Sequence, residues 1–254
     1  MIHTKKRQRE KKWKKGLKAS KFKYLKDDSC FALKIMHCKE LSKTLTSYYE
    51  SLFSAFGPQG WWPGRTRFEI IIGAILTQNT AWTNVEKAIT NLRDKKVLNP
   101  EKMRALAHAE LASLIRPAGY FNIKAKRLRH FLDHLFNNHK GSLDKLFRQD
   151  TAMLRAELLS INGIGPETAD SILLYAGDHP EFVVDAYTKR ILERHRVIDG
   201  KAEYEDVKTL FMQNLPKDLR LFNEYHALIV RTGKDFCRPR EPRCKECPLG
   251  RFLP

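Results

Sequence analysis

The sequence predicts an all-α protein. Apolar residues recur at intervals of three and four along most of the chain, the alternating patterns typical of strands are scarce, and glycine and proline mark the turns. These observations favour a helical core. At 254 residues, the chain is long enough to bury one large core or two small ones.

The predicted helices follow from this spacing in chain order. Leu41, Leu45, Tyr48, Tyr49 and Leu52 fall on one helical face, and a turn follows at 57–60. Apolar residues within 85–92 and 128–135 indicate two further helices. Later helices are predicted to contain 153–159, 166–176, 186–195, 204–215 and 221–234.

The charge of the chain is large and unevenly spread. Of the formal net charge of +18, residues 1–35 carry +10, from 13 Lys/Arg and three acidic residues, which leaves +8 for residues 36–254. A basic globular part favours a polyanionic partner, because attraction to phosphates dominates non-specific DNA affinity, although charge alone does not separate DNA from RNA. We expect residues 1–35 to be a disordered basic extension. It is either a DNA-binding tail, a solvated arm or the product of a start placed upstream of Met36.

The hydropathy pattern predicts a cytoplasmic protein without a membrane partner. The apolar stretch at 70–76 is far short of the roughly 20 residues that a membrane helix needs. The basic N-terminus leads into more basic residues instead of the apolar segment of a signal peptide.

The segment 158–190 combines a glycine turn with a downstream aspartate. It reads LLSINGIGPETADSILLYAGDHPEFVVDAYTKR, so that an apolar helix end runs into Gly163-Ile164-Gly165 and Pro166 opens the next helix. The glycines allow a tight turn and close approach, and freed amides at the helix N-terminus would suit a phosphate. An ordinary helix–helix turn is the alternative for these residues alone. Asp185, twenty residues after Gly165, is the candidate catalytic carboxylate.

This chain resembles the helix-hairpin-helix DNA glycosylases typified by endonuclease III. Three motifs occur in the family's order: I-L-T-Q-N-T at 75–80, the hairpin at 161–169 and V-D-A at 184–186. The resemblance covers residues 40–249. It implies two helical domains flanking a DNA-binding cleft, a barrel at 57–179 and a second domain from 36–56 plus 180–254, and a monomer acting on double-stranded DNA with a damaged base.

The resemblance also implies roles for individual residues. Asp185 would face a flipped-out nucleotide and either activate water or stabilise the oxocarbenium-like sugar, although it could also simply cap the helix that begins near Ala186. Bifunctional relatives carry a Schiff-base lysine two residues after the second hairpin glycine, where this chain has Glu167. A carboxylate cannot form an imine, so we expect a monofunctional glycosylase.

The substrate and DNA contacts follow from the same family. The aromatic residues resemble the branch that removes 3-methyladenine, since a cationic alkylated purine stacks well on aromatic faces. Mismatched thymine, uracil or an oxidised pyrimidine is the alternative within the family, and a non-catalytic helix-hairpin-helix DNA-binding protein is the alternative outside it.

The expected base-pocket residues are Trp82, Trp62, Trp61 and Lys234, with Phe68 nearby as either pocket or core. The expected DNA contacts are Gln78, Asn79, Gly163, Ile164, Gly165 and Lys124, where Gln78 fills the gap left by the base and Lys124 is either a phosphate contact or part of a solvated helix face.

Three of the five cysteines form a metal-ligand pattern. Cys237, Cys244 and Cys247 fall within eleven residues, which is typical of metal ligands in a cytosolic protein. In endonuclease III relatives this run binds a 4Fe–4S cluster with a fourth cysteine, at the position of Leu253 here. Three possibilities remain open: a cluster with three cysteine ligands, a fourth ligand from Cys30 or Cys38, or loss of the cluster.

Overall fold

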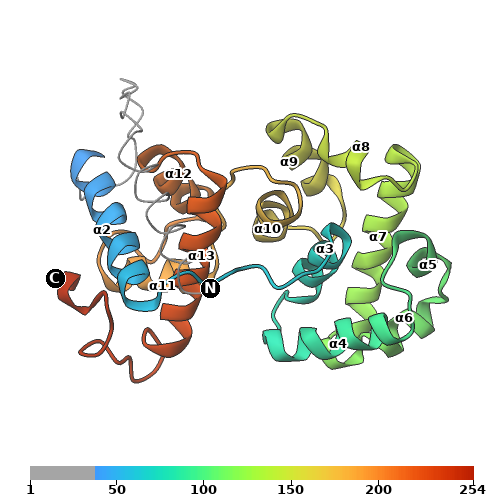
Figure 1. Cartoon of the computed structure of the whole chain (residues 1–254), viewed down its shortest axis with the longest axis horizontal. Helices are drawn as coiled ribbons and strands as arrows, with labels where there is room; N and C mark the ends of the chain where they lie inside the picture. The colour runs from blue at the N-terminus through green and yellow to red at the C-terminus, as the bar shows by residue number, and fades with distance from the viewer. Residues whose placement is uncertain (1–37) are drawn as a thin grey trace, which may run out of the picture. The chain divides into compact units, whose positions relative to one another are not determined.

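Helices are the only regular secondary structure in the part of the chain that the computed structural model describes, residues 38–254 (Figure 1). The all-α prediction is therefore confirmed. The helices are α2 (Cys38–Phe56), α3 (Arg67–Leu76), α4 (Trp82–Asp94), α5 (Pro100–Ala105), α6 (His108–Leu114), α7 (Phe121–His139), α8 (Leu143–Phe147), α9 (Thr151–Ser160), α10 (Pro166–Ala176), α11 (Ala186–Arg194), α12 (Tyr204–Asn214) and α13 (Leu219–Asp235), with short 3-10 turns η1 (Arg116–Ala118) and η2 (Gly250–Phe252).

Helices α3 to α10 share one apolar core, which extends from Phe68 to Ala176. Helix α3 is buried along almost its whole length, and α10, α4 and α7 all pack against it. Figure 1 shows α3 and α10 side by side, with the long α7 to their right in this view. Burial of each large aliphatic side chain in such a core contributes about 1.5–3 kcal/mol.

The first described helix packs with the last ones. Helix α2 contacts α12 and α13, and α11 lies along α13. Aromatic residues fill this second group: the rings of Phe182 and Phe211 stack with centroids 3.8 Å apart, and the hydroxyl of Tyr225 donates to the carbonyl of Leu45. The second group therefore joins α2, the first described helix, to helices from the C-terminal part of the chain.

A buried carboxylate links the two groups of helices. Asp170 of α10 is fully buried and accepts hydrogen bonds from Arg155 of α9 and from Tyr204 and Lys208 of α12. Buried charges persist in proteins when they are paired in this way. The pairing fixes α10, the helix that follows the glycine turn, against α9 and α12.

No described helix is both long and apolar enough to cross a membrane. The cytoplasmic location stays a prediction. The predicted basic extension and Cys30 lie outside the described residues.

Candidate active site

Asp185 occupies the N-cap of α11. Its Oδ1 accepts hydrogen bonds from the backbone N–H of Thr188 at 2.8 Å and from the Thr188 hydroxyl at 2.9 Å. The predicted capping role is therefore confirmed. Its side chain keeps 12% of its surface exposed. Oδ1 thus caps the N-terminus of α11, and Oδ2 takes no part in the cap.

His226 of α13 faces that second oxygen. Its Nε2 lies 3.6 Å from Oδ2 of Asp185, close enough for charge interaction but too far for a hydrogen bond. Its Nδ1 lies 2.5 Å from the hydroxyl of Tyr175, which can donate to it and leave the ring hydrogen on Nε2. Burial by itself would raise the pKa of Asp185, but His226 and the Thr188 hydrogen bonds outweigh it and hold that pKa below its usual range. The carboxylate is therefore ionised at neutral pH.

Glu167 stands near Asp185 at the start of α10. Partial desolvation raises the pKa of Glu167, and the negative charge of Asp185 raises it further, while His226 opposes the shift. The two acids therefore have opposite shifts. Such a separation is the usual sign of carboxylates in different roles.

The predicted pocket aromatics pack together. The rings of Trp62 and Trp82 meet edge to face with centroids 5.1 Å apart, and Trp61 lies 6.4 Å from Trp82. Trp62 also packs on Tyr175 at 4.9 Å, which connects the aromatic group to His226 and Asp185. Among the described residues, the indole N–H groups of Trp61 and Trp62 are buried without a hydrogen-bond partner.

Lys234 and Phe68 were also predicted near the pocket, and the structure places Lys234 at the surface and Phe68 in the core. The ammonium of Lys234 lies 5.9 Å from the ring centroid of Trp61, so the structure brings this lysine to the aromatic group. Phe68 is buried in the core of α3 to α10, which settles its alternatives in favour of packing.

The hairpin residues Gly163, Ile164 and Gly165 have three different environments. Gly163 has a φ of +94°, and a Cβ there would collide with the side chain of Arg127, so both conformation and space require glycine. Ile164 is buried, which leaves only its backbone for a ligand. Gly165 has an ordinary φ of −93° and open space around it at the N-cap of α10.

Gln78 is tethered to the hairpin. Its Nε2 donates to the carbonyl of Gly163 and to the Thr168 hydroxyl, each at 2.9 Å, while Arg127 donates to its Oε1. Asn79 is exposed, with a φ of +53°. The I-L-T-Q-N-T segment is therefore joined to the hairpin through the side chain of Gln78.

Lys124 does not fit its predicted role. It is only 1% exposed, and its ammonium donates to the carbonyls of Leu76 and Ala118 and to the Thr80 hydroxyl. A lysine with all three donors used inside the protein is not available to a phosphate. The expected contact is corrected to an internal brace.

The three C-terminal cysteines line one cavity. Cys237 is buried, Cys244 and Cys247 are half-buried, and none forms a disulfide. Among the described residues, no three cysteine sulfurs lie within 4.8 Å of one another, as ligands of a single ion would. A cluster binds its thiolates through separate irons and so suits a wider spacing. Leu253, which stands at the position of the relatives' fourth cysteine, lines the same cavity.

The site includes residues that sequence reasoning missed. Tyr175, His226 and Thr188 surround Asp185, and Arg127 holds Gln78. A signal existed for His226, because a histidine inside the apolar stretch 225–230 needs a buried polar partner. The sequence does not say which partner that is.

Comparisons with known proteins agree with this geometry. The HhH-GPD superfamily of base excision DNA repair proteins matches residues 72–217. A relative from Methanocaldococcus jannaschii, with the provisional name of a DNA repair glycosylase, is 51% identical over 206 residues, which are 80% of this chain and 93% of that relative. The structure of H. pylori 3-methyladenine DNA glycosylase bound to 1,N6-ethenoadenine has a TM-score of 0.65 and 28% identity, covering 78% of this chain and 98% of that one. A non-covalent endonuclease III–DNA complex has a TM-score of 0.72 and 21% identity, covering 86% and 96%, and shows the shared fold.

Proposed function

Because the chain belongs to the HhH-GPD superfamily of base excision DNA repair proteins, we propose that it is a monofunctional glycosylase that excises alkylated purines from double-stranded DNA. Family membership carries the broader statement, that the chain is a DNA glycosylase of base excision repair. The substrate and the absence of strand cleavage are the finer parts of the proposal.

The observation that carries the proposal is the carboxylate of Asp185, of which only one oxygen is used by the helix cap. Oδ1 is committed to the helix cap, and Oδ2 lies beside His226 with the side chain partly exposed. An ionised carboxylate at this point suits stabilisation of the positive charge that develops on the sugar as the glycosidic bond breaks. A carboxylate with a lowered pKa is a weak base, so electrostatic stabilisation is favoured over proton abstraction from water.

The aromatic group supports an alkylated purine as the substrate. An alkylated purine is electron-poor and often cationic, so it stacks favourably on indole faces. Lys234 already places a cation over Trp61, so this indole face suits a positively charged group. The structural neighbour from H. pylori, which acts on 3-methyladenine according to its name, supports the same class. A mismatched or oxidised pyrimidine is the alternative within the family.

Glu167 supports the monofunctional part. It occupies the position of the Schiff-base lysine of bifunctional relatives, and its carboxyl group cannot form an imine with an abasic sugar. We therefore propose that the base is released and the strand left intact.

A panel of duplexes with single lesions tests both finer parts. Wild-type protein is incubated with duplexes that contain 3-methyladenine, ethenoadenine, uracil or a thymine mismatch, and cleavage is scored with and without alkali. We expect release from the alkylated purines only, strand breaks only after alkali, and a rate loss of at least about 100-fold in Asp185→Asn. Base release that survives this substitution would instead support a non-catalytic role for Asp185, and alkali-independent nicking trapped by borohydride would contradict the monofunctional part.

The overall assembly follows from the same proposal. We propose that 57–179 and 36–56 plus 180–254 act as two domains of a monomer, with the extruded base between them. The hairpin backbone at Gly163 and Gly165 would hold a phosphate, and Gln78 and Asn79 would lie against the gap in the duplex.

We propose that Cys237, Cys244 and Cys247 hold a 4Fe–4S cluster through three thiolates. Arg194 donates to the Cys237 sulfur at 3.0 Å, which would stabilise a thiolate. The bound cluster would supply structural cross-linking of the C-terminal segment. Protein purified without oxygen should absorb at about 400 nm, and Cys244→Ser should lose this band. A colourless wild-type protein without iron would favour loss of the cluster.

A further inference from the structure

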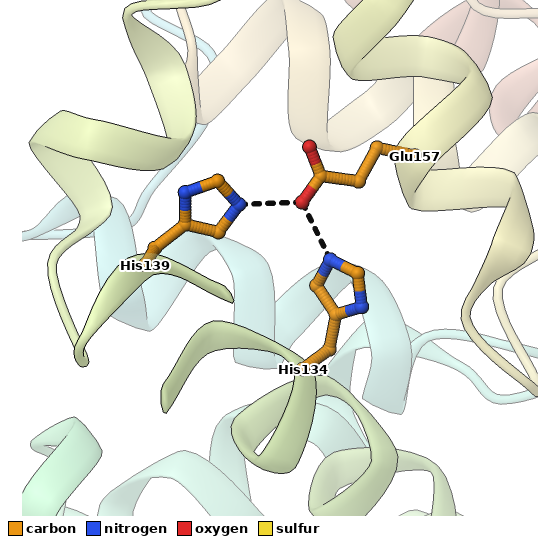
Figure 2. A group of neighbouring side chains, drawn as sticks. All are labelled: His134, His139 and Glu157. Atoms are coloured by element: carbon orange, nitrogen blue, oxygen red, sulfur yellow. Dashed lines mark hydrogen bonds and ion pairs between the residues drawn. The ribbon is translucent and has the colours of Figure 1, made fainter. Parts of the chain in front are cut away.

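Three metal-ligating side chains meet at a point that the glycosylase chemistry does not use. His134 and His139 come from α7 and Glu157 from α9, and Figure 2 shows both imidazole rings turned toward the carboxylate. Nε2 of each histidine lies 2.5 Å from Oε1 of Glu157. Among the described residues, these three form the only group of potential ligands whose donor atoms all lie within 4.8 Å.

The core of the surrounding helices fixes these positions. Leu135 follows His134 and Leu158 follows Glu157, and both leucines are fully buried in the shared core. The three polar side chains lie at the edge of this core, with 13–19% of their surface exposed. An ion and a water molecule can therefore reach a site whose backbone is held rigidly.

Neighbouring amides support the ligand atoms. The amide of Gln149 donates to Oε2 of Glu157 at 2.5 Å, so Oε1 is the oxygen left facing the histidines. The amide nitrogen of Asn138 lies 3.1 Å from Nδ1 and 3.3 Å from Nε2 of His134, so Nε2 becomes free as a ligand once this amide turns its oxygen toward Nδ1.

We propose that His134, His139 and Glu157 bind one divalent transition-metal ion, best suited to zinc, with water as the fourth ligand. Two imidazole nitrogens and one carboxylate oxygen are a donor set that zinc prefers, with bonds of about 2.0–2.2 Å. Tetrahedral geometry then separates the ligand atoms by roughly 3.3 Å. The histidines need to move away from the carboxylate by less than about 1 Å, which small rotations of these partly exposed side chains allow.

The local charge also suits a cation. Glu157 is the acidic member of the group and supplies its negative charge. With neutral imidazoles, the site carries one negative charge and becomes singly positive when it holds a divalent ion.

The ion would brace the helix that leads into the hairpin. Helix α9 ends at Ser160, just before the glycine turn, and His130 of α7 lies 3.0 Å from the carbonyl of Asn162 in that turn. Zinc between α7 and α9 would add a second link near the same segment. We expect zinc to change the stability of the protein and not the rate of base release, so the inference does not depend on the proposed substrate.

The competing explanation is a hydrogen-bonded triad without metal. Each neutral imidazole can donate an Nε2–H to Oε1, and this arrangement needs no ion. The two explanations differ in their response to zinc and in the effect of Glu157→Gln. Glutamine keeps a carbonyl acceptor for the histidines but loses the charge that a metal requires.

Calorimetric titration of zinc into the full chain, stripped of metal with a chelator, tests the proposal. We expect one zinc per chain at this site, binding weakened at least about 100-fold by His134→Gln, His139→Gln or Glu157→Gln, and no change in the matched control His108→Gln. Zinc at about 100 times its Kd should raise the Tm by roughly 5–10 °C in wild type only. Equal zinc affinity in wild type and all three variants would overturn the proposal.

Cobalt separates this site from the cysteines. Cobalt bound by imidazole and carboxylate has weak visible bands, whereas cobalt bound by thiolates adds an intense near-ultraviolet charge-transfer band. We expect visible bands that persist in Cys244→Ser and disappear in His139→Gln. A spectrum with thiolate bands alone would show that the cysteines are the metal site and would refute a site at Glu157. Unchanged circular dichroism of the variants guards against loss of folding.

Discussion

Asp185 combines a structural role in the helix cap with the catalytic role that we propose for it. Its Oδ1 caps the N-terminus of α11, and this hydrogen bond fixes the position of the carboxylate. Its Oδ2 takes no part in the cap and faces Nε2 of His226 at 3.6 Å. A fixed charge costs little reorganisation when the transition state forms, and this is the property that electrostatic catalysis requires.

His226→Gln should move the acid limb of the activity profile. A carboxyl group with a lowered pKa stays ionised as the pH falls, and activity is lost only when the pH passes through that pKa. Removal of His226 takes away a group that lowers the pKa of Asp185, so that pKa rises and activity is lost at a higher pH. Single-turnover base release across pH measures this shift. We also expect a loss of roughly tenfold at neutral pH, short of that in Asp185→Asn.

The control for this prediction is Thr188→Val, which removes only the hydroxyl bond to Oδ1 and leaves the backbone bond of the cap. Its acid limb should move in the same direction but less, because one hydrogen bond of the pair remains. An acid limb at the same pH in wild type and His226→Gln would mean that His226 does not set the charge of Asp185.

Sequence patterns find site residues only when neighbours in sequence define them. The prediction of Asp185 came from a motif that lies within one segment, and so did that of the cysteines. Lys124 was misjudged, because its acceptors come from Leu76 and Thr80, 48 and 44 residues away, and no local pattern shows them. His226 and Tyr175 were missed for the same reason, since they are 51 residues apart.

At the scale of elements, the hairpin depends on two glycines for different reasons. Gly163→Ala should cost about 1–3 kcal/mol of unfolding free energy, because alanine is strained at positive φ and displaces Arg127 from its bond to Gln78. Gly165→Ala should change stability by less than about 0.5 kcal/mol, since its φ is ordinary and its surroundings are open. Urea unfolding measures both.

For Gly165, the property that should change is DNA affinity and not stability. A methyl group at Gly165 would stand between the N-terminus of α10 and an approaching phosphate, so binding to a duplex with an abasic analogue should weaken about tenfold. Fluorescence anisotropy at fixed salt gives the comparison. Affinity equal to that of wild type would exclude close phosphate approach at Gly165.

The helices that the sequence predicted best have either one buried face or a clear start. Helix α10, which is buried throughout 168–176, was found through Pro166 at its first position and has the predicted bounds of 166–176. Helices α2, α11, α12 and α13 match within a few residues. Helix α3 was not predicted as a helix, because residues 68–76 are almost all buried and a fully buried segment shows no periodicity. Helices α5, α6 and α8 have five to seven residues, too few for a repeating pattern.

At the scale of the whole molecule, the buried Asp170 determines how the two groups of helices are held. It joins Arg155 of α9 to Lys208 of α12, and Lys208 also pairs with Glu181 in the segment between α10 and α11. Asp170 belongs to the T-A-D sequence that follows the hairpin. The structure gives this acid a packing role, in contrast to Asp185 fifteen residues later.

Asp170→Asn should therefore destabilise the protein by about 3–5 kcal/mol, because it leaves buried cations without their shared partner and turns an amide N–H toward donors. Glu205→Gln is the matched control, since Glu205 pairs with the same Arg155 but its side chain is 56% exposed. An exposed pair contributes about 1 kcal/mol or less. Urea unfolding monitored by circular dichroism compares the two variants. Equal losses would mean that solvent reaches the Asp170 network, and the two groups of helices would then be held together mainly by other contacts, such as that of α10 with α13.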